Sequence, residues 1–206
     1  LDDVRDGGAP APIIIHGGYS GNGDATGNEV TFKGGIVGDI YGGRSAGTGV
    51  TTGNTVRLGD GANVLTVGSR IGVVRGGNKA DDTGNILIVN TNADVAGVEN
   101  FQKIIFNINS DTLNRTNPML EATGSGLMTR NVDWRELTVH VAKYEAPVKT
   151  YEAESIVLMH NADGIEFERG GEDTYALGGG MKSVTTGNLE FDIVGKYLCK
   201  MQEYAG

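Results

Sequence analysis

Aspartates in three glycine-rich turns are the first residues whose type and spacing could do chemistry. The turns span residues 21–24, 59–63 and 80–83, and each offers carboxylate or amide oxygens. Calcium takes about six to eight oxygen ligands in proteins, so such turns are candidates for calcium binding. None of them matches the Gly-Gly-x-Gly-x-Asp repeat of calcium-binding β-rolls. Because Asp and Asn also favour ordinary solvated turns, we predict turns here and no metal site.

Carboxylates in the second half of the chain are candidates for acid–base chemistry. Glycoside hydrolysis needs two carboxyl groups about 5–10 Å apart. Eight acidic residues could supply such a pair if the fold brought two of them together: Glu121, Asp133, Glu136, Asp163, Glu166, Glu168, Glu172 and Asp173. No spacing singles out one pair, and the alternation over residues 165–168 indicates a strand with an outward-facing acidic side.

The histidines give no catalytic pattern either. His16, His140 and His160 are dispersed along the chain, and His140 alternates with valines, which predicts an outward side chain. The sequence contains no Gly-x-Ser-x-Gly elbow and no Walker loop. We therefore predict no catalytic residue, no cofactor and no enzymatic activity.

Aromatic side chains are the remaining candidates for a binding surface. Tyr19, Tyr41 and Trp134 are expected near the surface, and aromatic faces bind sugars and protein partners well. Each ring could equally pack against a neighbouring repeat of the fold. We favour Trp134 among the three because charged residues, Asp133 and Arg135, flank it.

The composition excludes several classes of protein. The chain has 206 residues and a formal net charge of −9, whereas a nucleic-acid-binding protein presents a basic patch. No apolar run approaches the roughly 18–20 residues of a membrane helix, so we expect no membrane-embedded segment. A single cysteine, Cys199, excludes a cysteine-based zinc site. The chain starts at Leu1 without a visible signal peptide, which fits a mature protein whose export signal was removed, or a fragment.

Two glycine-containing phrases recur together through the first half of the chain. Thr-Gly-Asn before an apolar run ends at Asn28, Asn54 and Asn85, in steps of about 26 and 31 residues, a spacing typical of solenoids. A double glycine also recurs once per repeat, at Gly17-Gly18, Gly42-Gly43 and Gly76-Gly77. A fourth Thr-Gly-Asn, at residues 186–188, stands far from the others and is equally well explained as an isolated turn.

These phrases predict an all-β fold, a right-handed parallel β-helix with one rung of three short strands per 25–31 residues. We expect one β-helical domain over residues 1–206, with regular repeats over 13–110 and less regular rungs over 111–206. One rung cannot bury its own apolar face, but stacked rungs can. Alternation predicts inward side chains at Val30, Phe32, Val56 and Leu58. The amides of Asn28, Asn54 and Asn85 are expected to bond from rung to rung.

The repeat unit also resembles a known family. Residues 26–43, with their Thr-Gly-Asn, Gly-Gly and Tyr-Gly-Gly phrases, resemble the repeats of autotransporter passenger domains, and residues 98–106 are similar to the Asn-Phe rung that follows them. The resemblance covers residues 13–110. It implies a β-helix exported through the outer membrane and displayed on the surface of a Gram-negative bacterium, with adhesion as the usual role.

The function expected from the sequence is therefore that of a non-enzymatic bacterial surface protein. As a passenger segment of an adhesin, it would contact a protein or glycan of a host or bacterial cell through many weak contacts. Its localisation would be extracellular, and no nucleic-acid partner is expected. Self-association into an end-to-end filament is the alternative, since open β-helix ends expose unpaired strand edges. A polysaccharide-acting enzyme is the third hypothesis.

Overall fold

The structure is a computed structural model. It describes residues 12–60, 65, 69–79, 81–108, 119–123, 129–130, 137–141, 156–161, 166–169, 173–176, 182–186, 189–194 and 197–200. Side chains are described over residues 12–60, 65, 69–79, 81–107, 119–123 and 159–160. All regular structure in these residues is β-strand and none is helix, as the sequence predicted.

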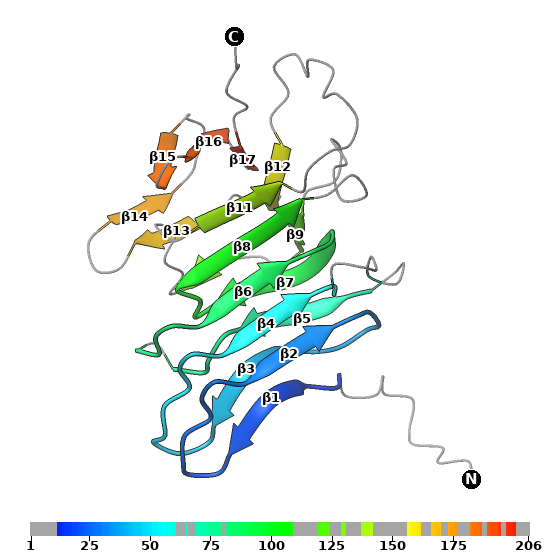
Figure 1. Cartoon of the computed structure of the whole chain (residues 1–206), viewed down its shortest axis with the longest axis vertical. Coiled ribbons are helices and arrows are strands. Elements are labelled where there is room, and N and C mark those ends of the chain that lie inside the picture. The colour runs from blue at the N-terminus through cyan, green and yellow to red at the C-terminus, as the bar shows by residue number, and fades with distance from the viewer. Residues whose placement is uncertain are drawn as a thin grey trace.

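Successive strands alternate between two sheets as far as β9 (Figure 1). Sheet A has the order β1-β3-β5-β7-β9-β12-β17-β16-β15, with β10 paired to β7, and sheet B has the order β11-β8-β6-β4-β2. Neighbouring strands are parallel from β1 to β12 in sheet A and throughout sheet B. The strands are β1 (Ile15–Ser20), β2 (Glu29–Phe32), β3 (Ile40–Ser45), β4 (Thr55–Leu58), β5 (Ile71–Arg75), β6 (Ile86–Val89), β7 (Ala93–Glu99), β8 (Lys103–Ile108), β9 (Leu120–Ala122), β10 (Thr129–Arg130), β11 (Leu137–Val141), β12 (Ile156–Asn161), β13 (Glu166–Arg169), β14 (Asp173–Ala176), β15 (Lys182–Thr186), β16 (Leu189–Val194) and β17 (Tyr197–Lys200).

The core consists of apolar columns that run from strand to strand. In sheet B the in-register partners of one column are Val30, Val56, Leu87 and Ile104, and those of the next are Phe32, Leu58, Val89 and Phe106. All these side chains are buried, which confirms the inward positions predicted from the alternation in β2 and β4. Sheet A contributes Ile40, Val74, Val98 and Leu120 to the same cluster. Burial of each such side chain contributes about 1.5–3 kcal/mol.

The double glycines and the Thr-Gly-Asn turns recur together because they touch. A Cβ on Gly43 would lie 2.6 Å from Nδ2 of Asn54, and one on Gly76 would lie 2.5 Å from Cβ of Asn85. The asparagine therefore occupies the space that a side chain at the double glycine would need. The glycine inside the turn phrase has its own reason, since Gly53 has a φ of 67°, where residues with a Cβ are strained.

A third strand was expected in each rung, and in the described repeat that contains residues 34–37 it is reduced to an isolated bridge. Residues 34–37, which lie between β2 and β3, form no regular strand and contribute one isolated bridge, between Ile36 and Arg70. Gly34 and Gly35 have φ values of 144° and 114°, which are incompatible with a regular strand. In the next repeat, residues 64–67 lie outside the described residues except for Leu65.

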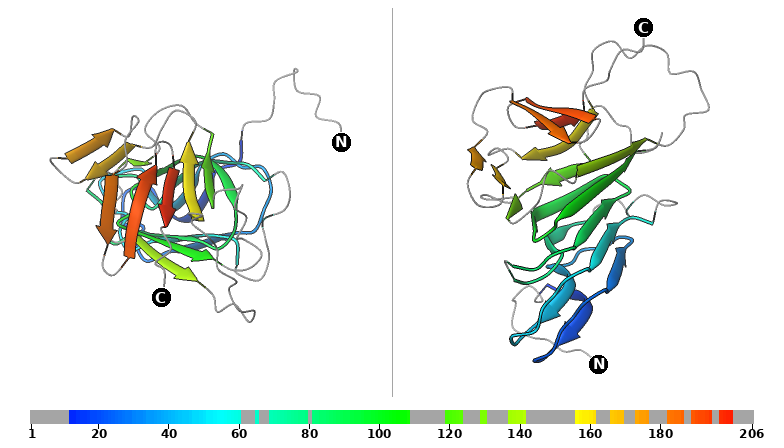
Figure 2. Two further views of the ribbon diagram at one scale, coloured as in Figure 1. Left: turned by 90° about the horizontal axis from the view of Figure 1, so that it is seen from above. Right: turned by 60° about the vertical axis from the view of Figure 1, so that its left-hand side comes forward.

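Strand pairing changes after β12. This strand pairs in parallel with β9 but antiparallel with β17, and β15, β16 and β17 follow as antiparallel neighbours. They lie at the end of the stack opposite β1 (Figures 1 and 2). Parallel rungs were expected up to residue 206, so the described strands beyond β12 differ from that prediction. The fourth Thr-Gly-Asn begins at the end of β15, which pairs antiparallel with β16 with Thr186 opposite Leu189, and its Gly187 and Asn188 lie outside the described residues.

Candidate functional site

The asparagines of the repeat form a hydrogen-bonded column inside the stack. The backbone N–H and the side-chain Nδ2 of Asn28 donate to Oδ1 of Asn54, at 2.9 and 2.8 Å. The same two donors of Asn54 reach Oδ1 of Asn85, at 2.9 and 3.2 Å. The column ends where the N–H of Asn85 donates to Oε1 of Gln102 at 2.9 Å. These bonds hold neighbouring repeats together. Because Asn54 and Asn85 are fully buried, they are not available to a ligand.

Two of the three acidic turns that were candidates for calcium bond to neighbouring repeats. Asp24 accepts the N–H of Val50 at 2.9 Å. Asp82 is buried and accepts the backbone N–H groups of Thr51 and Lys79, at 2.8 and 2.9 Å, together with the Thr51 hydroxyl. These bonds satisfy the Asp82 carboxylate within the protein. Within the described residues no three His, Cys, Asp or Glu side chains are grouped as metal ligands would be.

A row of side chains on the outer face of sheet A comes from the residues that precede each double glycine. His16, Tyr41 and Arg75 are in-register partners on β1, β3 and β5, and Glu99 on β7 continues the row. The His16 ring stacks on the Tyr41 ring with 5.3 Å between centroids, and the Arg75 guanidinium carbon lies 5.2 Å from the same centroid on Tyr41. The repeat thus builds an aromatic and charged row as well as a core.

Arg75 is the centre of an ion-pair network in this row. Its Nε donates to Glu99 at 2.6 Å, and its Nη1 donates to Asp39 and, at 3.1 Å, to the Tyr41 hydroxyl. Burial acts to lower the pKa of the guanidinium, but its hydrogen bonds to Glu99 and Asp39 outweigh burial and raise the pKa. The arginine neutralises both carboxylates.

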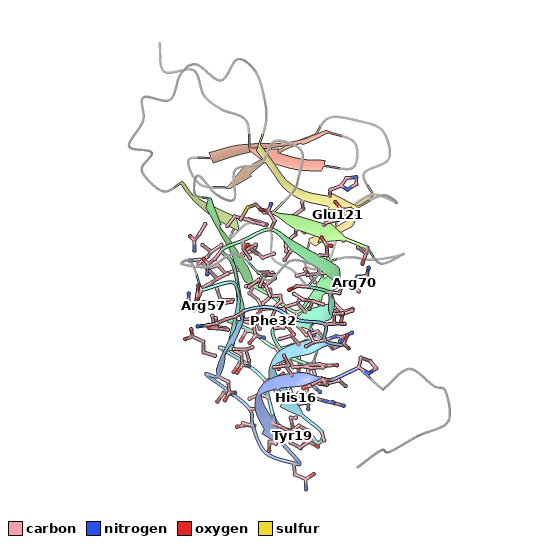
Figure 3. The ribbon with its side chains drawn as sticks, turned by 90° about the vertical axis from the view of Figure 1, so that its right-hand side faces the viewer. His16, Tyr19, Phe32, Arg57, Arg70 and Glu121 are labelled. Carbon is pink, nitrogen blue, oxygen red and sulfur yellow. The ribbon has the colours of Figure 1, made fainter. Side chains whose placement is uncertain are left out.

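A second, more open group lies beside this row at the N-terminal end of the stack. Tyr19 on β1 is the in-register partner of Arg44 on β3, and the Tyr19 side chain is 60% exposed. Its ring contacts His16, with 5.6 Å between centroids and 51° between planes, and the Arg44 guanidinium lies 5.3 Å from the Tyr41 centroid. Figure 3 shows His16 and Tyr19 near one another at this end. We call His16, Tyr19, Tyr41 and Arg44 the aromatic–arginine face.

The electrostatics of this face differ from those of the Arg75 network. Burial, and then the positive charge of Arg44, lower the pKa of His16 below its ordinary value of 6.5, so the imidazole is neutral at neutral pH. Nδ1 of His16 is buried and has no hydrogen-bond partner in the described part of the chain. Arg44 is the positive charge of the face, and no described carboxylate lies within ion-pair distance of it.

A histidine–carboxylate pair lies further along the same sheet. Nδ1 of His160 on β12 lies 2.8 Å from each carboxylate oxygen of Glu121 on β9. Among the eight acidic candidates, Glu121 has a described side chain, whereas those of the other seven lie outside the description. The sequence analysis considered Glu121 and His160 separately and missed the pair, because no repeat phrase relates β9 to β12. A second carboxylate for glycoside hydrolysis is therefore not identified.

Two of the three predicted binding aromatics, Tyr19 and Tyr41, are brought to one face by the structure, and Trp134 lies outside the described residues. Sequence reasoning missed His16, Arg44 and the Arg75 network. The signal was present, since His16, Tyr41 and Arg75 each precede a double glycine and must therefore fall in one row when the repeats stack.

The chain matches no known family model, and no curated protein or solved structure is significantly similar to it. In the described part of the chain no helix is long and apolar enough to cross a membrane.

Proposed function

We propose that the chain is a right-handed parallel β-helix that forms part of a bacterial surface protein. The coil is supported by the alternation of successive strands between two parallel sheets, from β1 to β9. The handedness is supported by a general rule, since connections between parallel strands of one sheet are right-handed in about 98% of cases.

In this proposal the chain is a passenger segment of an adhesin, displayed outside the outer membrane, and it attaches the bacterium to host cells or to neighbouring bacteria. The observation that carries it is the in-register stacking of the repeat, in which Asn28, Asn54 and Asn85 bond in one column. Stacked repeats form a scaffold that lengthens with each copy and presents the same face many times. Such a scaffold suits attachment through many weak contacts.

Attachment can be measured with beads coated with the purified chain. We expect coated beads to be retained on a panel of epithelial and bacterial cells several-fold better than beads coated with an unrelated acidic protein. Soluble chain should compete and reduce the retention. Retention equal to that of the control beads on every cell type would contradict the adhesin function.

End-to-end assembly is a second candidate, and one observation favours it. Within the described residues, β1 and β2 each pair on one side only, so the N-terminal end presents two strand edges. Such edges are templates for pairing with another chain. Light scattering with negative-stain imaging tests it: polymers that lengthen with concentration would favour a filament subunit, and a monomeric rod would exclude one.

A further inference from the structure

We propose that the aromatic–arginine face binds an acidic sugar, a pyranose ring that carries a carboxylate. The inference rests on the proposed surface function and names the class of ligand. Tyr19 would stack on the sugar ring, and Arg44 would bind the carboxylate. Terminal sialic acids and uronic acid units within a polysaccharide share this chemistry.

The platform for the sugar ring is Tyr19. Its side chain is 60% exposed, while its ring centroid lies 5.6 Å from that of His16, with the two rings tilted. His16 in turn stacks on Tyr41, with 29° between the ring planes, so the three rings support one another. A ring held in this way loses little conformational freedom when a ligand binds, and aromatic faces attract the C–H groups of a sugar.

The charge for the carboxylate is Arg44. In the same structure Arg75 is neutralised by Asp39 and Glu99, and Arg57 is paired with Glu29. Arg44 has no such partner among the described carboxylates, although the chain carries a net charge of −9. Arg44 is partly exposed. A guanidinium presents a planar fork of N–H donors that matches a carboxylate, and a fork without a carboxylate partner is therefore open to an anionic ligand.

The geometry allows one sugar to use both groups. Tyr19 and Arg44 are direct partners across β1 and β3, so their side chains leave the same face of the sheet from strands about 4.8 Å apart. Two described acidic groups of the neighbouring row, Asp39 and Glu99, are both bonded to Arg75, which reduces their repulsion of a bound anion. A neutral sugar would leave Arg44 unused, and a simple carboxylate would leave Tyr19 unused.

The test is a titration of the purified full chain with matched pairs of sugars. The probes are 3′-sialyllactose with lactose, and tetragalacturonate with its carboxyl-reduced form, followed by saturation-transfer NMR and calorimetry. We expect at least one acidic probe to bind about tenfold or more tightly than its neutral partner. The pair that shows the difference distinguishes a sialic acid from a uronate source.

Variants locate the site. Tyr19→Ala and Arg44→Ala are each expected to weaken binding of the acidic probe about tenfold or more, whereas Tyr19→Phe retains the ring and should bind nearly as well. Arg57→Ala, an arginine on the outer face of sheet B, is the matched control and should not change binding. Circular dichroism and thermal midpoints verify that each variant is folded.

Equal affinity for acidic and neutral partners, unchanged affinity in Arg44→Ala, or no binding of any probe would each overturn the inference. These outcomes are separable from failure of the surface function. If beads coated with the chain attach to cells and Arg44→Ala beads attach equally well, the adhesin proposal stands and the acidic-sugar site is excluded. Acidic-probe binding without any attachment of beads to cells would support the site and contradict the adhesin.

Discussion

Asn54 donates both its backbone N–H and its side-chain amide to one oxygen, Oδ1 of Asn85, a full repeat further along the chain. Asn54 in turn accepts the equivalent pair of bonds from Asn28. The asparagines therefore link successive repeats, and the bonds between Asn54 and Asn85 are buried. An unsatisfied buried donor costs about 1–3 kcal/mol, so the column both stabilises the stack and fixes its register.

Asn54→Ala tests the column. The substitution removes the acceptor of two donors on Asn28 and leaves a space in the core, so we expect a loss of about 2–4 kcal/mol in the free energy of unfolding. Urea denaturation measures it. The matched control is Asn22→Ala in an exposed turn, where we expect a change within about 0.5 kcal/mol. Equal, small effects of the two substitutions would contradict a stabilising column.

Gly43→Ala tests the reason for the double glycine. The new Cβ would lie 2.3 Å from the carbonyl oxygen of Ala25 and 2.6 Å from Nδ2 of Asn54. We expect a loss of at least about 1–3 kcal/mol because backbone must move to make room. Gly21 has open space around its Cβ position, so Gly21→Ala should leave the thermal midpoint nearly unchanged. An unchanged free energy of unfolding in Gly43→Ala would show that neighbouring repeats do not approach this closely.

Arg75→Ala tests the ion-pair network on sheet A. It leaves Asp39 and Glu99 partly buried without their common counter-charge, and we expect a loss of about 1–3 kcal/mol. The comparison is Arg57→Ala, which breaks the more exposed pair with Glu29 and should cost less than about 1 kcal/mol. A double-mutant cycle of Arg75→Ala with Glu99→Ala should show coupling, and purely additive effects would exclude it.

His16 should make the stability depend on pH. Burial and Arg44 lower the pKa of His16 in the folded state, so the unfolded chain binds the proton more readily. The contribution of His16 to the stability of the fold is therefore intact at pH values above its ordinary pKa of 6.5. It is lost as the pH falls through the lowered pKa of the folded state.

Urea denaturation at pH 7.5 and pH 5 measures this dependence. We expect the wild-type chain to lose more stability between these pH values than His16→Phe, which keeps a ring but cannot bind a proton. The carboxylates contribute to both chains alike and cancel in the comparison. Identical losses in the two chains would contradict a lowered pKa.

The parts of the fold that the sequence predicted are those that repeat. The spacing of Asn28, Asn54 and Asn85 predicted which residues would stack, and the alternation of Val30 and Phe32 predicted which side of β2 is buried. These features follow from local rules that act identically in every copy.

The features that the sequence analysis missed depend on contacts between segments that share no sequence motif. The sequence pattern alone does not distinguish the antiparallel pairing of β15 to β17 from the parallel pairing of the earlier strands. The Glu121–His160 pair arises where β12 happens to continue sheet A. The aromatic–arginine face needed the register of β1 on β3, which places Tyr19 opposite Arg44.

The central claim, display on the outside of a bacterial cell, is tested most directly by antibody labelling of cells that produce the protein. Antibodies raised against the purified chain are applied to intact cells and to permeabilised cells, with an antibody to an internal protein as the control for intactness. The account predicts labelling of intact cells at nearly the level of permeabilised ones. Labelling that appears only after permeabilisation would contradict it.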